Sequence, residues 1–505
     1  MKLVPILIAA AALAAVMVGP APSFADSVRL GADVDAQTLD PRVMRNTTAY
    51  RAANMIYDGL VALDENLRPV PGLAVTWENP EPTIWLFHLR DGVKFHDGRD
   101  FSAEDVVYTF ETILDPELKS RWRSLYTPIT KIEVMDRLTV RVELSEPYAP
   151  LLLYLDIGIV PKAYVEGRGD LASKPVGTGP MKLATWARGS KIELEPNAAY
   201  WGGAPKSDGF TFVIVADNTS RAVAFEAGDL DIIQSPLSPQ DILRLAAKDD
   251  IGKSIVGAAG ITYLNFNTAA EHVSDPAMRH ALSMLIDQKV IVDGIYEGVD
   301  EIATSILLPS HFAYTNAIRQ PSFNPAGAKQ ALADLGWSDS DGDGVLDKDG
   351  KALSIEISTH SEDPNRIQAV EFIQATFKAN GIDATVSIAD WPAFFQRVQY
   401  GQHQIALLGW LNLVDPDQLM FGQLSTGAGL NWGKYSNTDV DGFLSAGRSS
   451  TDLDQRIEAY RKAAAIISEE VPYYVISYQG YQMFHNKDVE LRPDIRGMMR
   501  SALGL

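Results

Sequence analysis

A tryptophan and two polar residues follow a short apolar run in the last quarter of the chain. Residues 405–408 are Ile-Ala-Leu-Leu, a run that is typical of a strand buried on both faces. Gly409 ends the run, and Trp410, Asn412 and Asp415 follow it. Open α/β sheets bind ligands beyond the carboxyl ends of their strands. The stretch therefore predicts an aromatic platform with polar anchors for a bound molecule. The alternative is a core Trp410 followed by a helix that begins at Asp415.

An acidic loop carries a second pattern with chemical meaning. Residues 339–344 read Asp-Ser-Asp-Gly-Asp-Gly, which resembles the start of a calcium-binding loop, because hard cations prefer clustered carboxylates. The twelfth position of such a loop needs a bidentate Glu, and here it holds Gly350. The sequence therefore favours an acidic turn in front of a strand at 353–357, and we predict no metal site.

The sequence contains none of the common catalytic signatures. There is no Gly-x-Ser-x-Gly, no His-Glu-x-x-His and no Gly-x-x-x-x-Gly-Lys. There is also no cysteine, which excludes disulfides, thiolate metal ligands and cysteine nucleophiles. The eight histidines do not show metal-ligand spacing. We therefore predict a protein that is not an enzyme and needs no cofactor. The alternative is a hydrolase whose triad is assembled by the fold alone.

Length and charge narrow the class of protein further. The chain has 505 residues, of which 46% are hydrophobic and 22% charged, as in ordinary soluble globular proteins of several domains. The formal net charge of −21 argues against nucleic acid and anionic membranes as partners.

The first 25 residues have the composition of a secretory signal peptide. Lys2 precedes an apolar stretch at 3–18, and Ser23-Phe24-Ala25 forms a small-x-small cleavage site. No later apolar run is long enough to span a bilayer, and no cysteine follows that could carry a lipid anchor. We therefore expect a soluble exported monomer, not embedded in the membrane, in a bacterial periplasm.

Local patterns predict an α/β protein. Residues 83–90 alternate as a strand with one apolar side, and Ser102 and Asp105 resemble a capping box that opens a helix. A helical stripe covers 46–60. Short apolar runs at 213–215, 261–266 and 405–408 are separated by helical patterns, as in α/β lobes.

Several motifs in a fixed order resemble one family. They are Trp77, residues 85–98 (Trp-Leu-Phe-His-Leu-Arg-Asp-Gly-Val-Lys-Phe-His-Asp-Gly), 101–106 (Phe-Ser-Ala-Glu-Asp-Val), 175–180 (Pro-Val-Gly-Thr-Gly-Pro), Asn197-x-x-Tyr200-Trp-Gly-Gly203, 227–231 (Ala-Gly-Asp-Leu-Asp), 263–268 (Tyr-Leu-Asn-Phe-Asn-Thr), Arg279-x-Ala281 and 431–437 (Asn-Trp-Gly-Lys-Tyr-Ser-Asn). Together they cover nearly all of residues 28–490. The chain thus resembles the dipeptide/oligopeptide/nickel class of ABC-transporter solute-binding proteins.

That resemblance implies a fold of two α/β lobes that close on a ligand, with an extra domain inserted in the first lobe. The boundaries that it implies are 1–25 for the signal peptide, 26–44, 175–262 and 478–505 for lobe I, 45–174 for the inserted domain and 263–477 for lobe II.

The resemblance also implies a binding site with one departure. In peptide-binding relatives an Asp three residues after the Trp receives the peptide ammonium, and Leu413 stands at that position. A buried ammonium without a carboxylate is costly, so Asp415 is the substitute that we consider. Relatives hold a ligand carboxylate with an Arg near the position of Arg366.

Four further residues complete the predicted site, although each also suits a structural role. They are Thr38, Asn265, Asn267 and Tyr478. The resemblance implies capture of a peptide or peptide-like small organic solute and its delivery to the transmembrane subunits of an ABC permease. A non-peptide solute such as an opine or an oligosaccharide, an exported hydrolase on the same scaffold, and an exported chaperone are the alternatives.

Overall fold

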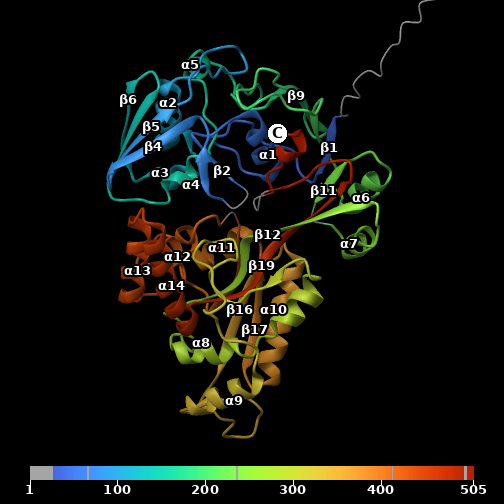
Figure 1. The fold of residues 1–505 in the computed structure, drawn as a ribbon. Coiled ribbons are helices and arrows are strands. Elements are labelled where there is room, and N and C mark those ends of the chain that lie inside the picture. Colours follow the sequence, from blue (N-terminus) through green and yellow to red (C-terminus); the bar gives the residue numbers. More distant parts are fainter. Residues whose placement is uncertain (1–26, 65–66, 235–236, 412, 494–496) are drawn as a thin grey trace, which may run out of the picture.

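The computed structural model describes residues 27–64, 67–234, 237–411, 413–493 and 497–505. The predicted signal peptide and Asn412 lie outside these residues. Three bodies make up the described chain (Figure 1): an inserted domain and lobe I lie side by side in the upper half, and lobe II lies below them. The strands β12 (Ile251–Phe266) and β19 (Tyr473–Asn486) pass between the halves.

One long sheet runs through both lobes. Its strand order is β17-β16-β18-β12-β19-β11-β1-β10-β9-β8, with β13 paired to β19. Lobe I contributes β1 (Val28–Ala32), β8 (Met181–Ala187), β9 (Lys191–Pro196), β10 (Phe210–Ile214) and β11 (Ile232–Gln234). Lobe II contributes β13 (Glu301–Ile302), β16 (Ser354–His360), β17 (Asp383–Ala389) and β18 (Ile405–Trp410). The two-lobed α/β arrangement agrees with the predicted fold class.

Lobe I buries apolar side chains on both faces of its strands. Leu30 and Phe212 pack with the helix α1 (Thr47–Ile56) on one face, and Ile233 packs with α6 (Asn218–Glu226) and α7 (Pro239–Ala246) on the other. The predicted boundary at 44/45 differs from this packing, because α1 shares the core of lobe I rather than that of the inserted domain.

The inserted domain has its own core. A sheet of four strands, in the order β4-β5-β7-β6, packs against α2. Trp85, Phe87 and Leu89 of β5 alternate inward, as predicted, and each such side chain contributes roughly 1.5–3 kcal/mol. The capping box of Ser102 and Asp105 is present at the start of α2. The elements are β2 (Val61–Leu63), β3 (Pro69–Pro71), β4 (Ala74–Glu81), β5 (Ile84–Leu89), β6 (Ile129–Asp136), β7 (Thr139–Leu144), α2 (Ala103–Leu114), α3 (Arg123–Tyr126), α4 (Leu151–Tyr154) and α5 (Lys162–Glu166).

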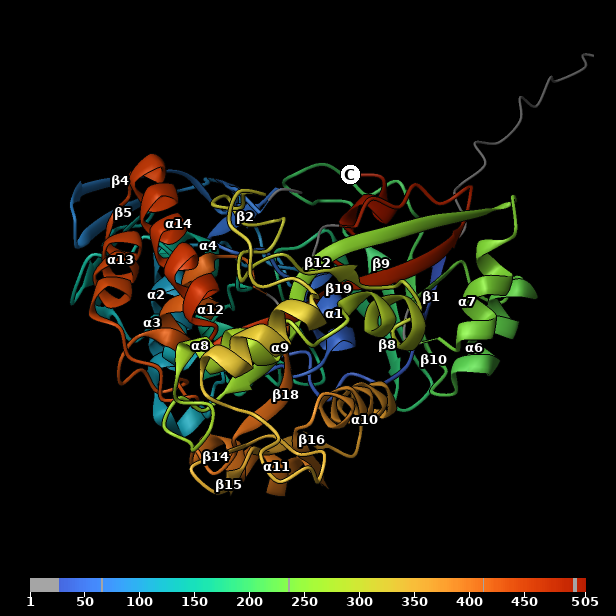
Figure 2. The same ribbon diagram turned by 90° about the horizontal axis from the view of Figure 1, so that it is seen from below.

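Lobe II has helices on both faces of its sheet, as Figure 2 shows with α12–α14 on one side and α10 on the other. Alternate residues of β18 therefore enter different cores, so that Ala406 and Leu408 pack on one face and Ile405 and Leu407 on the other. The elements are α8 (Pro276–Ser283), α9 (Pro325–Asp334), β14 (Asp347–Lys348), β15 (Lys351–Ala352), α10 (Pro364–Ala379), α11 (Trp391–Gln399), α12 (Pro416–Leu424), α13 (Thr438–Ser449) and α14 (Leu453–Glu470).

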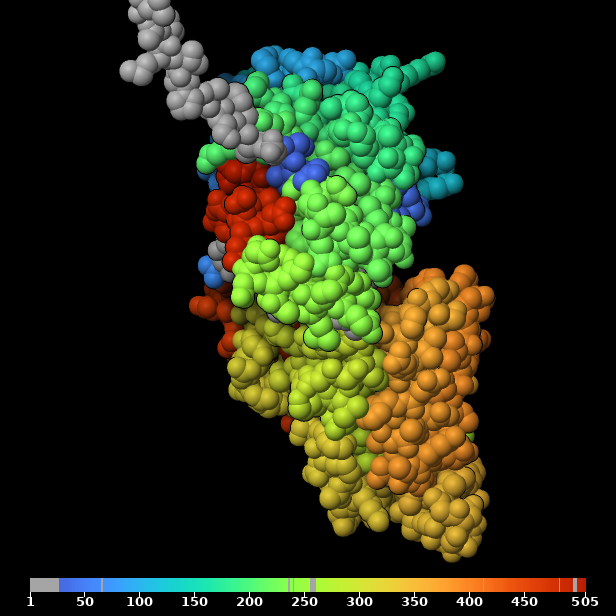
Figure 3. Space-filling view, turned by 90° about the vertical axis from the view of Figure 1, so that its right-hand side faces the viewer, coloured from blue at the N-terminus to red at the C-terminus, as the bar shows by residue number. Residues whose placement is uncertain are grey.

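The inserted domain touches lobe II at α13. The backbone N–H of Ala149 donates to the carbonyl of Arg448 at 2.9 Å, and the Arg448 guanidinium lies 5.1 Å from the centre of the Tyr148 ring. Val414 also packs against the core of the inserted domain. On another side of the molecule, Figure 3 shows the surface hollowed between the upper half and the orange segment of lobe II.

Candidate functional site

Trp410 is the last residue of β18 and lies opposite Ile261 of β12. Residues 405–408 are buried, as predicted, whereas Gly409 and Trp410 are half-buried. The strands β16, β17 and β18 are parallel, so their carboxyl ends lie at the same edge of the sheet. Trp410 was predicted to lie at this edge. In Figure 1 the edge points toward the upper half of the molecule.

An aromatic series extends from Trp410 along the edge. The ring centres are 6.0 Å apart for Trp410 and Trp432, 5.1 Å for Trp432 and Phe395, and 5.3 Å for Phe395 and Trp391. Trp391 is 42% exposed, whereas Trp432 is 5% exposed. Trp432 is therefore a buried member of the series, in contact with the rings of Trp410 and Phe395. Exposed aromatic faces of this kind suit an apolar or planar group.

Arg366 reaches the same edge from the first turn of α10. Asp363 caps this helix, and its carboxylate also forms an ion pair with Arg366, whose Nε lies 3.1 Å from it. Arg366 Nη1 lies 3.1 Å from Nε2 of His360, the last residue of β16. Nη2 lies against Gly409, where a Cβ would come within 2.1 Å of it. The absence of a side chain at Gly409 therefore leaves room for the guanidinium at the end of β18.

The guanidinium keeps one donor group without a partner. Within the described residues, Arg366 Nη2 makes no hydrogen bond, and the side chain is 16% exposed. Gln479 Nε2 approaches the same point above Gly409, at 2.9 Å from where a Cβ would stand. A guanidinium suits a carboxylate because its N–H groups form a planar fork. The carboxyl edge of lobe II thus joins an aromatic surface to a cationic donor.

Asp415 has a different role from the one predicted. It is the N-cap of α12, its side chain accepts from the backbone N–H of Asp417, and it is fully buried. Arg456 Nη2 donates to both of its carboxylate oxygens, at 2.9 and 2.8 Å. Its oxygens are therefore occupied by protein groups. The alternative noted for this stretch, a capped helix that begins at Asp415, describes the local structure.

No carboxylate in the described part of 410–417 is left to receive an ammonium group. Asp417 is buried and accepts from Arg448 Nε and Nη2 at 2.9 and 2.8 Å. Burial raises the pKa of Asp417, and Arg448 opposes that rise. Leu413 is fully buried in the core of lobe II. This end of the site is therefore apolar where peptide-binding relatives are expected to be anionic.

Three of the other predicted residues are buried and bonded within the protein. Asn265 donates to the Tyr473 hydroxyl at 3.3 Å, and Asn267 donates to the carbonyls of Gly401 and His403. The Tyr478 hydroxyl bonds to the backbone of residues 304–307. These contacts agree with a structural role for Asn265, Asn267 and Tyr478.

Thr38 lies in lobe I, in the loop after β1. Its side chain is half-buried, and its Oγ1 accepts from the backbone N–H of Asp40 at 3.2 Å. Its part in binding stays a prediction, as does that of Asn412, which lies outside the described residues. Trp391 and His360 were not predicted. Trp391 comes two residues after the end of β17, close to the position that Trp410 has at the end of β18, so a similar sequence signal could have found it.

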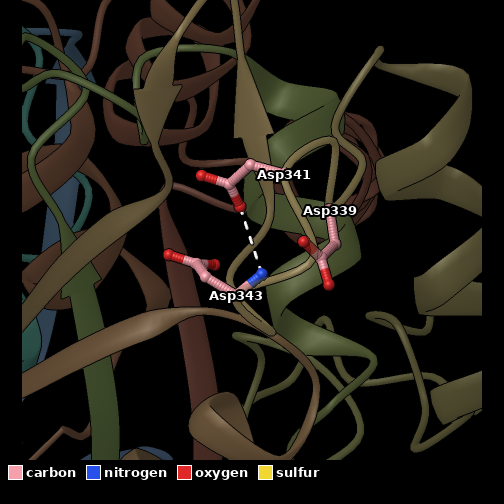
Figure 4. Close-up of side chains that lie close together, drawn as sticks. All are labelled: Asp339, Asp341 and Asp343. Atoms are coloured by element: carbon pink, nitrogen blue, oxygen red, sulfur yellow. Dashed lines mark hydrogen bonds between the residues drawn. The ribbon is translucent and has the colours of Figure 1, made fainter.

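The acidic loop has the geometry of a set of capped turns (Figure 4). The carboxylates of Asp339, Asp341 and Asp343 lie within 4.8 Å of one another and are exposed. Asp339 accepts from the backbone N–H of Gly342, and Asp341 accepts from that of Asp343 at 3.1 Å. These bonds account for the spacing of the three residues without an ion.

A cavity of about 340 Å³ lies elsewhere, at the junction of the inserted domain with lobe I. Asp58 and Arg500 lie in its wall, joined by a hydrogen bond of 2.9 Å. No residue of the predicted site lines it. The polar groups of Asp58 are already bonded to Thr178 and Trp201, so this cavity does not carry the chemistry of the site.

Comparison with known proteins places the chain in a family. The oligopeptide-binding protein AppA of Bacillus subtilis is 29% identical over 86% of this chain and 83% of its own. Its structure with a nonapeptide superposes with a TM-score of 0.75, over 95% of this chain and 98% of that one, at 25% identity. Protein XP55 of Streptomyces lividans is 31% identical over 90% of this chain and 84% of its own.

A further solved structure supports the fold alone. HbpA2 of Haemophilus parasuis has a TM-score of 0.85 at 24% identity, covering 94% of this chain and 98% of that one. A family model covers residues 68–432, which include the aromatic series and Arg366. On these grounds the chain belongs to the bacterial extracellular solute-binding proteins, family 5.

Proposed function

We propose that this protein captures a peptide or peptide-like small organic solute outside the cytoplasm and delivers it to the transmembrane subunits of an ABC permease. The observation that carries the proposal is the convergence of Trp410, Trp391 and Arg366 at the carboxyl edge of the lobe II sheet. Binding sites of α/β proteins lie at such edges. The name of AppA, an oligopeptide-binding protein, supports a peptide as the solute.

The charges at this edge favour an acidic group of the solute. The carboxylates of Asp415 and Asp417 are paired with Arg456 and Arg448, whereas Arg366 retains a free donor. A solute ammonium beside Leu413 would have no counter-ion and would be costly to bury. We therefore place the carboxylate of the solute at Arg366 and an apolar or aromatic side chain on the rings of Trp410 and Trp391.

Capture proceeds by closure of lobe I onto lobe II. The lobes are joined by β12 and β19, so they can rotate about this pair while each core stays packed. A solute that touches both lobes only in the closed form stabilises that form by the difference in its affinity for the two states. The permease would recognise the closed form.

The protein works in the bacterial periplasm, after removal of residues 1–25, as a soluble monomer without a lipid anchor. None of the helices in the described residues is both long and apolar enough to cross a membrane. The relatives reported above are named as binding proteins or carry no enzyme name, which supports a role without catalysis.

Native mass spectrometry of the mature protein with a mixture of di- to nonapeptides tests the proposal. We expect one peptide to be retained per protein molecule. Acidic or carboxylate-terminated peptides should be retained in larger amounts than their amidated forms. Cleavage of the peptides during incubation would favour the hydrolase instead. Retention of opines or oligosaccharides in place of every peptide would overturn the choice of solute.

A further inference from the structure

The pairing of β12 with β19 has two irregular points, and the one between Val256 and Gly260 lies where the strands pass between the lobes. Tyr473–Gln479 of β19 pairs with β12 on the lobe II side, and Tyr481–Asn486 pairs with it on the lobe I side. The register of β12 shifts between Val256 and Gly260, so that Gly480 faces extra residues of β12. Irregular pairing bends strands locally. Gly480 is therefore where the strand can turn when the lobes move.

A carboxylate holds β19 at this point. Asp300 accepts a hydrogen bond of 2.6 Å from the Ser477 hydroxyl and one of 3.3 Å from the backbone N–H of Gly480. The next residues, Glu301 and Ile302, form β13 and pair with Tyr478 and Ser477. Asp300 and β13 thus attach the lobe II part of β19, up to Gly480, to the rest of lobe II.

Charged and titratable groups surround this carboxylate. Burial raises the pKa of Asp300 to about 6, and the two hydrogen bonds and Arg366 oppose that rise. Asp363, at the start of α10 with Arg366, favours the protonated form. Tyr296 interacts electrostatically with Asp300 and stays neutral, because burial raises the pKa of its hydroxyl. Arg366 therefore stabilises the ionised carboxylate at the hinge as well as facing the binding edge.

We infer that Asp300 is a clasp on the hinge: its ionised carboxylate fixes β19 at Gly480, and its protonation frees the strand to turn. An acidic group bound at Arg366 adds a negative charge near Asp300, which favours proton uptake there. Occupation of the site and release of the clasp are then linked, and each promotes the other. The link to the solute rests on the function proposed above, whereas the clasp itself does not.

Hydrogen exchange without any solute tests the clasp, so its failure is distinguishable from failure of the proposed function. Protection of the Gly480 amide is measured by mass spectrometry on the mature protein between about pH 5 and pH 8, after correction for intrinsic exchange. We expect protection to fall about tenfold as the pH falls through about 6. Asp300→Asn should show the low protection at every pH, and Glu301→Gln should match the unmodified protein.

Ser477→Ala supplies a variant that keeps the carboxylate. The Ser477 hydroxyl lowers the pKa of Asp300, so its loss should move the midpoint of the protection curve to higher pH. His360 is a further titratable group beside Arg366, in addition to Asp363. A pH dependence that survives in Asp300→Asn and vanishes in His360→Asn would overturn the inference. So would equal, pH-independent protection in the unmodified protein and Asp300→Asn.

Discussion

One terminal nitrogen of Arg456 donates to both carboxylate oxygens of Asp415, 41 residues away along the chain. The pair is buried, with side-chain exposures of 9% and 0%. It joins the start of α12 to α14 and thereby fixes the chain that follows Trp410. An acidic residue near the platform thus holds the fold, and Arg366 is the residue that we propose for contact with the solute.

Removal of one member of this pair should destabilise lobe II. Asp415→Ala leaves Arg456 buried without a counter-ion and α12 without its cap, at a cost of about 3–5 kcal/mol. Urea unfolding followed by tryptophan fluorescence measures this change. At low temperature the folded fraction should still bind solute with unchanged affinity. The exposed Asp339→Ala is the control and should alter stability by less than about 0.5 kcal/mol. A loss of affinity in Asp415→Ala without a loss of stability would instead support a role for Asp415 in binding the solute ammonium.

The aromatic series should carry much of the affinity. Trp410→Ala removes the ring that ends β18, and we expect affinity for peptides to fall about tenfold to a hundredfold. Isothermal titration with a peptide found to bind measures the loss. Tyr400→Ala serves as the control, because Tyr400 is 66% exposed and takes no part in the aromatic series. Equal affinities of the two variants would show that the platform does not contact the solute.

Arg366 should bind the carboxylate of the solute. Arg366→Gln is expected to weaken a carboxylate-terminated peptide about tenfold to a hundredfold and to leave its amidated form nearly unchanged. Comparison of the two peptides on one variant separates recognition from general damage. Arg397→Gln is the matched control. Arg397 lies in α11 and is already paired with Glu356, so we expect its replacement to affect neither peptide. A similar loss for both peptides would contradict the assignment.

Acid should destabilise the folded protein through buried histidines. Burial lowers the pKa of His96 and His403 to about 4 and that of His311 to about 3. The unfolded chain therefore binds more protons than the folded one between about pH 6.5 and pH 4, so stability falls as the pH falls through this window. Each histidine contributes on the order of 3 kcal/mol to that loss.

Asp300 acts in the opposite direction, because its raised pKa makes the folded state bind its proton more tightly between about pH 4 and pH 6. The stability that Asp300 adds at low pH is smaller than the stability lost through the three histidines. Urea midpoints at a series of pH values check the net slope. Constant stability from pH 7 down to pH 4 would show that the three histidines are not buried in the neutral form.

The local elements could be predicted from the sequence because their causes are local. The buried strand at 405–408, the alternation of β5 and the capping box of α2 follow from neighbours within a few positions. Family motifs supplied the order of the lobes, which local patterns alone do not contain.

The partners of the polar residues could not be predicted, because they come from distant parts of the chain. Asn265 bonds to Tyr473, 208 positions away, and Tyr478 bonds to Ser305, 173 positions away. Such residues look like binding groups in the sequence until their partners are known. Asp300 went unnoticed for the same reason, since only the fold brings it to Gly480.

A thermal-shift measurement tests the central claim most directly. The mature protein and a Trp410→Ala, Arg366→Gln double variant are heated with free, amidated and N-acetylated peptides, opines, oligosaccharides and nickel complexes. A solute at about one hundred times its dissociation constant adds roughly 2.7 kcal/mol to the free energy of unfolding. We predict that carboxylate-terminated peptides, N-acetylated ones included, raise the midpoint of the unmodified protein and not that of the double variant. Equal shifts in both proteins, or no shift with any peptide, would contradict the account.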